Sequence, residues 1–126
     1  MQYEEFRQRV EHRLGGNRSG GDADKAISAA LQTLGERITG GEARDLAEQL
    51  PGKLQAPLQQ ADEAAEDFSI EEFFQRVAER EGLDINKARN DVPAVMTVLR
   101  EALTQGALDD VMAQLPANFN ERLFQS

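Results

Sequence analysis

Apolar residues recur at every third or fourth position along most of the chain, whereas no stretch alternates apolar and polar residues over the length of a strand. This spacing places the apolar side chains on one face of an α-helix, so the pattern predicts an all-α fold. Phe6, Val10 and Leu14 mark the first predicted helix, which ends at the glycines that follow.

Three further apolar stripes predict three more helices in the first half of the chain. One stripe runs from Ile27 to Ile38, a second covers residues 42–50, and a third follows Pro51. Pro57 lies inside the last of them. It predicts a kink or an end at that point, because a proline in a helix interior costs about 3 kcal/mol.

Two capping boxes mark helix starts. Thr39 is followed three residues later by Glu42, and Ser69 is followed in the same way by Glu72. In such a box the hydroxyl accepts a hydrogen bond from the first turn, and the carboxylate reaches back to the N–H of the capping residue. The two glycines after Thr39 predict a sharp turn before the new helix.

The pattern of residues 3–59 returns in residues 68–124. The segments EEFRQRVEHRLG and EEFFQRVAEREG are identical at eight of twelve positions, and the motif QLP at 49–51 recurs at 114–116. Two repeats are too few for an open solenoid, which needs three or more. The sequence therefore predicts a compact helical bundle of two tandem, similar four-helix units with approximate internal twofold symmetry.

The repeats are expected to form one helical domain over residues 1–126. An acidic connector at 59–67 joins them, and a glycine-rich connector at 15–24 lies inside the first repeat. In the second repeat Asp84 is a predicted helix cap. Pro93 predicts a break into a short helix and a longer one.

Four segments carry a family resemblance: EEFRQRV, LGERITGGEARDLAEQLP, FSIEEFFQRVAEREG and MAQLPANFNERLF. They resemble the bacterial domain-of-unknown-function family 2267 (DUF2267), and the likeness runs from about residue 3 to 124. It implies an all-helical fold with the two-copy arrangement. It implies no activity and no catalytic residues.

Composition narrows the classes of partner. The 126 residues suit one domain, and with no cysteine the chain can form neither a disulfide nor a thiolate metal site. Its 23 acidic residues against 14 basic ones give a net charge of -9, which repels phosphate backbones, so no nucleic-acid partner is expected. The N-terminus lacks the apolar core of a secretory signal and no apolar run could span a bilayer, so we expect a cytoplasmic protein without a membrane partner.

Catalytic and metal chemistry find little support in the sequence. His12 is the single histidine, flanked by charged residues on a predicted polar face, so it is expected at the surface. No serine stands in a nucleophile-elbow motif, and neither Glu-x-x-His pairs nor a calcium loop is present. We therefore expect no cofactor and no metal, and a non-enzymatic role is favoured.

A comparison of the repeats indicates an interaction surface. The second repeat carries bulkier apolar residues where the first has smaller or charged ones, and Phe74 stands where the first repeat has Arg7. Phe74 either packs between the repeats or belongs to an exposed apolar patch. The candidate interface comprises Phe74, Leu108, Met112, Phe119, Leu123 and Phe124.

We accordingly expect a small soluble helical interaction module that binds a protein partner, or itself as a homo-oligomer, through the apolar surface of the second repeat. The alternative is a small-ligand-binding protein, or an undescribed enzyme, that uses a groove between the repeats. The residues predicted to line that polar groove are Glu36, Arg37, Glu42 and Arg44.

Overall fold

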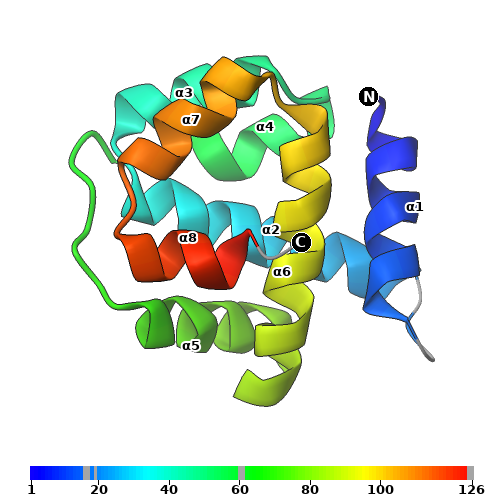
Figure 1. Cartoon of the computed structure of the whole chain (residues 1–126). Coiled ribbons are helices and arrows are strands. Elements are labelled where there is room, and N and C mark those ends of the chain that lie inside the picture. Colours follow the sequence, from blue (N-terminus) through cyan, green and yellow to red (C-terminus); the bar gives the residue numbers. More distant parts are fainter. Residues whose placement is uncertain (16–17, 19, 60–61, 125–126) are drawn as a thin grey trace.

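The computed structural model describes residues 1–15, 18, 20–59 and 62–124. Over these residues the chain forms eight helices and no strand, which confirms the all-α prediction (Figure 1). The helices are α1 (Tyr3–Leu14), α2 (Gly20–Arg37), α3 (Gly40–Glu48), α4 (Gly52–Gln59), α5 (Ile70–Glu81), α6 (Ile85–Ala102), α7 (Gln105–Ala113) and α8 (Ala117–Leu123).

The two longest helices, α2 and α6, form the centre of the bundle. α2 packs against α1, α4 and α5, whereas α6 packs against α1, α5 and α8. Figure 1 shows α1 on the outer side of α6, and α3 and α7 side by side at one end of the molecule. The first and last four helices therefore exchange contacts, because α1 lies on α6 and α5 lies on α2.

Helix α5 is buried on more than one side. Phe73 and Phe74 point in different directions, yet 0 % and 1 % of their surfaces are exposed, because α5 lies between α2, α6 and α8. The ring of Phe73 meets that of Phe119 edge-on at 6.1 Å, and the guanidinium of Arg122 lies 5.2 Å from the centre of the Phe74 ring. Each buried phenylalanine stabilises the fold by about 1.5–3 kcal/mol.

At the starts of α3 and α7 only the hydroxyl half of a capping box is formed. In both helices the threonine hydroxyl accepts an N–H of the first turn. The hydroxyl of Thr39 accepts the N–H of Glu42 at 3.3 Å, as predicted. The backbone N–H of Thr39, however, donates to Oε1 of Gln114 at 2.9 Å, and that of Thr104 donates to Oε1 of Gln49 at 3.2 Å. The glutamine that follows each of these short helices thus caps the first turn of the other one, Gln49 that of α7 and Gln114 that of α3.

The acidic connector runs close to the turn between α2 and α3. The N–H of Gly40 donates to the carbonyl of Glu63 at 3.0 Å, and a Cβ at Gly40 would lie only 2.8 Å from the carbonyl oxygen of Asp62. The N–H of Glu66 donates to the carbonyl of Glu36 at 2.8 Å. This close backbone approach explains why a glycine stands at position 40, the first residue of α3.

Helix α6 continues through Pro93, so the predicted break is wrong. Pro93 removes one N–H donor, but Val92 and Ala94 on either side of it are buried, and this packing holds the helix together. The hydroxyl of Thr97 bonds the Pro93 carbonyl at 2.8 Å. Helix α4 is described as far as Gln59 and holds Pro57 in its interior.

Parts of the two predicted connectors fall outside the described residues, namely 16–17 and 19 in the first and 60–61 in the second. Within the described part, α2 begins at Gly20, inside the segment expected to be a connector. Asp22 therefore lies in the first turn of this helix, where the negative charge of a carboxylate interacts favourably with the positive end of the helix dipole.

Candidate functional site

A hollow of about 250 Å³ lies between α1, α2 and α4. Its polar lining comes from Tyr3, Asp24, Ser28, Gln32 and Lys53, and its apolar lining includes Ile27, Leu54 and Pro57. A concave site with an apolar floor and a few polar groups is the usual form of a small-molecule site.

Each of the three helices supplies one of the groups that meet most closely, Tyr3 from α1, Asp24 from α2 and Lys53 from α4. Tyr3 begins α1, and its hydroxyl donates a hydrogen bond to Oδ1 of Asp24 on α2. Lys53 lies in the first turn of α4, with its Nζ 5.1 Å from the centre of the Tyr3 ring, within range of a cation–π contact. Pro57, farther along α4, has no N–H to offer the carbonyl of Lys53.

The Tyr3 hydroxyl holds its proton tightly. Burial, followed by the hydrogen bond to Asp24 and the charge of Asp24, raises the pKa of Tyr3 to about 12. The hydroxyl therefore stays protonated near neutral pH and serves as a donor rather than as a base. This chemistry suits recognition of a molecule better than proton transfer.

Charges of opposite sign remain available in the hollow. Among the described residues no carboxylate oxygen lies within 4 Å of the Lys53 Nζ, although Glu4 is close enough for Lys53 to help lower its pKa. Asp24 uses Oδ1 for Tyr3, and no described residue donates to its Oδ2. No local pattern in the sequence indicates that these three helices meet here, so Tyr3, Asp24 and Lys53 are not among the predicted site residues.

The residues predicted to line a polar groove lie in different surroundings. Glu36 is half-buried between α2 and α5, where it accepts from Arg76 at 3.0 Å and from Arg80 at 2.7 Å. Burial alone would raise the pKa of Glu36, but the hydrogen bonds from Arg80 and Arg76 outweigh it and hold the pKa below its usual range. Thr33 accepts a further bond from Arg80 at 2.7 Å.

Arg37 is buried rather than open to a groove. Its Nε donates to the carbonyl of Phe68 at 3.1 Å, and its guanidinium lies 4.8 Å from the centre of the Phe119 ring. Arg44 instead faces the acidic connector, where it pairs with Glu63 at 2.6 Å.

Glu42 faces other carboxylates across α3 and α7. Burial, and then the charges of Asp110 and Asp45, raise its pKa. None of Glu36, Arg37, Glu42 and Arg44 lines the hollow between α1, α2 and α4. The four predicted groove residues are thus divided between an ion-pair network, the core, an exposed pair and an acidic edge.

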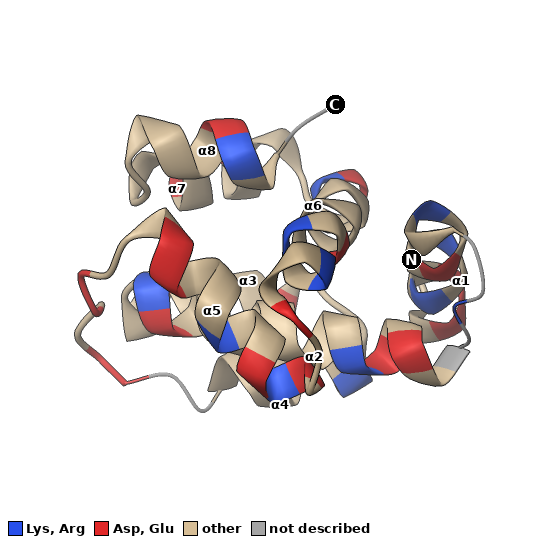
Figure 2. Cartoon of the chain, turned by 90° about the horizontal axis from the view of Figure 1, so that it is seen from below, with Lys and Arg blue, Asp and Glu red and all other residues tan. Residues whose placement is uncertain are grey.

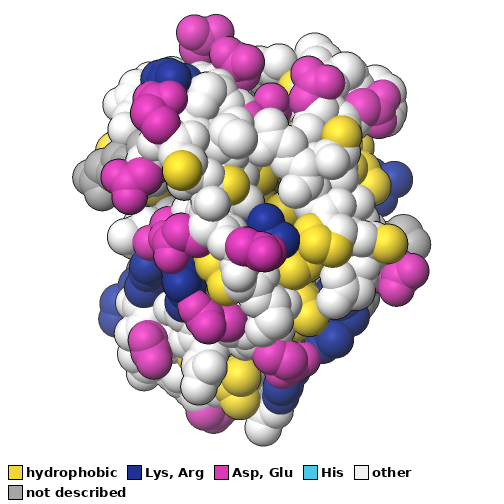
Figure 3. Space-filling model, turned by 90° about the vertical axis from the view of Figure 1, so that its left-hand side faces the viewer, with side chains coloured by type: hydrophobic (Ala, Val, Ile, Leu, Met, Phe, Trp, Pro, Cys, Tyr) yellow, Lys and Arg dark blue, Asp and Glu magenta, His cyan; other side chains and the backbone are white. Residues whose placement is uncertain are grey.

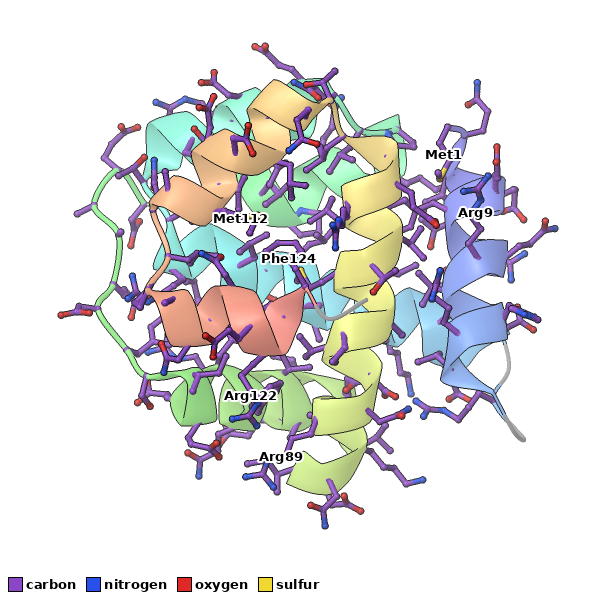
Figure 4. The ribbon with its side chains drawn as sticks, in the orientation of Figure 1. Met1, Arg9, Arg89, Met112, Arg122 and Phe124 are labelled. Carbon is purple, nitrogen blue, oxygen red and sulfur yellow. The ribbon has the colours of Figure 1, made fainter. Side chains whose placement is uncertain are left out.

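The predicted apolar interface is mostly part of the core. Five of its residues are between 0 % and 7 % exposed, namely Phe74, Leu108, Phe119, Leu123 and Phe124. Met112 is partly exposed and packs against the core. In Figure 4, Met112 and Phe124 both lie in the region bounded by α6, α7 and α8. These five side chains therefore present no open apolar face in this chain.

A second hollow, of about 530 Å³, lies between α1 and α6 and is lined by His12, Arg9 and Arg13. Arg9 and Arg13 both pair with Glu101, at 3.2 Å and 3.5 Å. His12 is exposed, as predicted. The cations of this hollow are already neutralised by the protein.

Neither a metal site nor a membrane span is found in the described part of the chain. No three side chains of His, Asp or Glu gather there in a way that could hold a metal ion. No helix over these residues is both long enough and apolar enough to cross a bilayer. Figure 2 shows basic and acidic residues interspersed on most helices, with acidic residues along the connector before α5.

A family model described as "Uncharacterized conserved protein (DUF2267)" matches residues 3–122. No curated protein shows significant similarity to the chain.

Proposed function

The chain belongs to the DUF2267 family, whose description assigns no activity, and from the geometry we propose that it is a small-ligand-binding helical domain. The observation that carries this proposal is the hollow between α1, α2 and α4, where Tyr3, Asp24 and Lys53 converge over an apolar floor. The proposal keeps the small-ligand alternative drawn from the sequence and moves its site away from Glu36.

The charges in the hollow indicate the class of ligand. Lys53 is a cation without an acidic partner within 4 Å among the described residues, and Asp24 has one oxygen to spare. A small zwitterion with an apolar body matches both charges and the floor formed by Ile27 and Leu54. Free apolar α-amino acids have this chemistry, and a volume of about 250 Å³ suits molecules of that size.

Titration of the ¹⁵N-labelled protein with free leucine and phenylalanine, followed by NMR, tests the proposal. We expect shifts confined to α1, α2 and α4, and an affinity lowered about tenfold in Lys53→Met, since one partly desolvated charge contact is worth about 1.4 kcal/mol. Lys25→Met is the matched control, because Lys25 is exposed on α2 and does not line the hollow.

Amides and N-acetyl derivatives of the two amino acids separate the ligand class from the site itself. If neither the amino acids nor their amides and N-acetyl derivatives shift amides of α1, α2 or α4, the hollow is not a binding site. If the amides and N-acetyl derivatives bind as well as the zwitterions, the site is kept and the ligand class is wrong.

A second candidate is the interaction module expected from the sequence. One observation favours it: Met112 is partly exposed, whereas Ala47, its counterpart in the first repeat, is buried. Figure 3 shows apolar side chains gathered near the middle of one face, bordered by acidic and basic side chains. A partner protein or a second copy of the chain would cover such a spot.

Light scattering over a concentration series tests self-association. A mass that rises with concentration, and that Met112→Lys holds at the monomer value, supports the interaction module. A monomer mass at every concentration argues against a homo-oligomer.

We also propose that α1–α4 and α5–α8 are two copies of one four-helix unit, related by an approximate twofold axis between α3 and α7. Two reciprocal hydrogen bonds support it, Thr39 to Gln114 and Thr104 to Gln49, since both pairs are related by the same shift of 65 residues. The exchange of α1 onto α6 and of α5 onto α2 follows the same rule. Superposition of the two halves in a crystal structure would test the axis.

A further inference from the structure

Two buried carboxyl groups lie together where α5 ends against α6. Glu81 is the last residue of α5 and is 5 % exposed, and Asp91, in the first half of α6, is 0 % exposed. Carboxyl groups are seldom so deeply buried unless they are paired. Neither residue lines the hollow between α1, α2 and α4.

Asp91 has donors for both of its oxygens. Arg18, from the connection between α1 and α2, gives Nη1 to Oδ1 at 3.0 Å and Nη2 to Oδ2 at 2.7 Å. Asn90 adds a bond to Oδ1 at 3.3 Å. This two-pronged contact is the strong form of an arginine–carboxylate pair, so Asp91 is the ionised member of the cluster.

Glu81 lacks such donors. Both of its carboxyl oxygens are shielded from solvent, and no N–H or O–H of the described residues donates to either one. An ionised carboxylate left in this state would carry a large desolvation penalty. Asp91 is the carboxyl group that acts most strongly on Glu81, and a proton on Glu81 would remove this penalty and let its side chain donate to Asp91.

We propose that Glu81 and Asp91 form a proton-binding site. The proton resides on Glu81, which donates to Asp91, while Arg18 neutralises the remaining negative charge. The site joins three parts of the chain, because Arg18 is 73 residues from Asp91 and Glu81 closes α5.

The charged groups around Glu81 agree with this assignment. Asp91 on α6 and Asp22 on α2 act on Glu81 as negative charges, and Arg18 opposes them as a cation. Burial first, and then the hydrogen bond and charge of Asp91, raise the pKa of Glu81 to about 8. Protonated Glu81 is therefore the main form at neutral pH.

The bound proton makes the fold sensitive to alkali. Because the pKa of Glu81 is higher in the folded chain than in the unfolded chain, its stabilising effect is complete below about pH 4.5 and is lost as the pH rises through about 8. Arg18 also lines an open hollow of about 580 Å³ with Lys87 and Asn90, which brings solvent to the edge of the site. Above that pH two carboxylates compete for one guanidinium.

Urea unfolding from about pH 5.5 to 9 tests the site in the full chain. For the wild-type protein and for Glu79→Gln we expect the midpoint to fall as the pH rises. Glu79 is the matched control, since it is exposed on the same helix. For Glu81→Gln, whose amide can still donate to Asp91, we expect a flatter profile, with the largest gain over wild type at the alkaline end.

Infrared spectroscopy of the wild-type protein detects the protonated carboxyl group directly, so it tests the proposal even if Glu81→Gln does not fold. We expect the carbonyl stretch of a protonated carboxyl group at neutral pH, its loss at about pH 9, and its absence from Glu81→Gln. The proposal is overturned if the wild-type protein lacks this band at neutral pH, or if Glu81→Gln keeps the wild-type pH profile.

Discussion

At the scale of single residues, two glutamines account for the repeated QLP motif. Gln49 closes the start of α7 through the N–H of Thr104, and Gln114 closes the start of α3 through the N–H of Thr39. A helix start leaves several N–H groups without partners, so a side chain that reaches one of them is stabilising by about 0.5–2 kcal/mol. The motif is thus explained by capping rather than by chemistry.

Substitution of Gly40 is expected to destabilise the fold, because the connector backbone lies against this residue. In Gly40→Ala the new Cβ would meet the Asp62 carbonyl oxygen at 2.8 Å, so the connector backbone must move. We expect a loss of about 1–3 kcal/mol in the free energy of unfolding, measured by urea denaturation. Gly106→Ala is the control, because a Cβ there meets nothing within 4 Å. Equal stability of the two variants would contradict this account.

Some residues of the sites could have been recognised from the sequence and others could not. Glu81 lies on the stripe formed by Phe74, Val77 and Ala78, and an acidic residue on an apolar face signals a buried carboxyl group. Tyr3 carries no such signal, because its partner on α2 is 21 residues away and is fixed by tertiary packing. Contacts of this kind depend on which helices become neighbours.

At the scale of helices, the sequence predicted the stripes but not what covers them. The apolar residues of α8 look like a surplus when that helix is considered alone. In the folded chain Phe119, Leu123 and Phe124 are buried, since α8 docks on α5 and α6. Whether an apolar face is an interface or part of the core is decided by packing that periodicity cannot reveal.

Helix α8 is therefore expected to be required for stability. Ending the chain after Pro116 removes three buried side chains, and Leu123→Ala alone should cost about 2–5 kcal/mol. Thermal melting by circular dichroism measures both changes. Glu121→Ala, on the exposed side of α8, should change stability by less than about 0.5 kcal/mol. An unchanged melting temperature after truncation would refute a packing role for α8.

At the scale of the whole molecule, the exchange of contacts between α1–α4 and α5–α8 predicts a single unfolding transition. α2 is covered by α5 and α6 is covered by α1, so neither half keeps its core when the other unfolds. Hydrogen exchange in increasing urea should show the slowest amides of α2 and α6 opening together. Loss of protection in α1–α4 at lower urea than in α5–α8 would contradict this prediction.

The packing of α1 on α6 and of α5 on α2 also restricts how this protein can change over evolutionary time. A mutation that deleted either half would expose the apolar face of the remaining long helix. The shortened product would then be an aggregation-prone fragment instead of a smaller version of the same domain. Descendants of such a chain can diverge by replacing side chains and by lengthening the segments between helices, while the number of helices stays fixed.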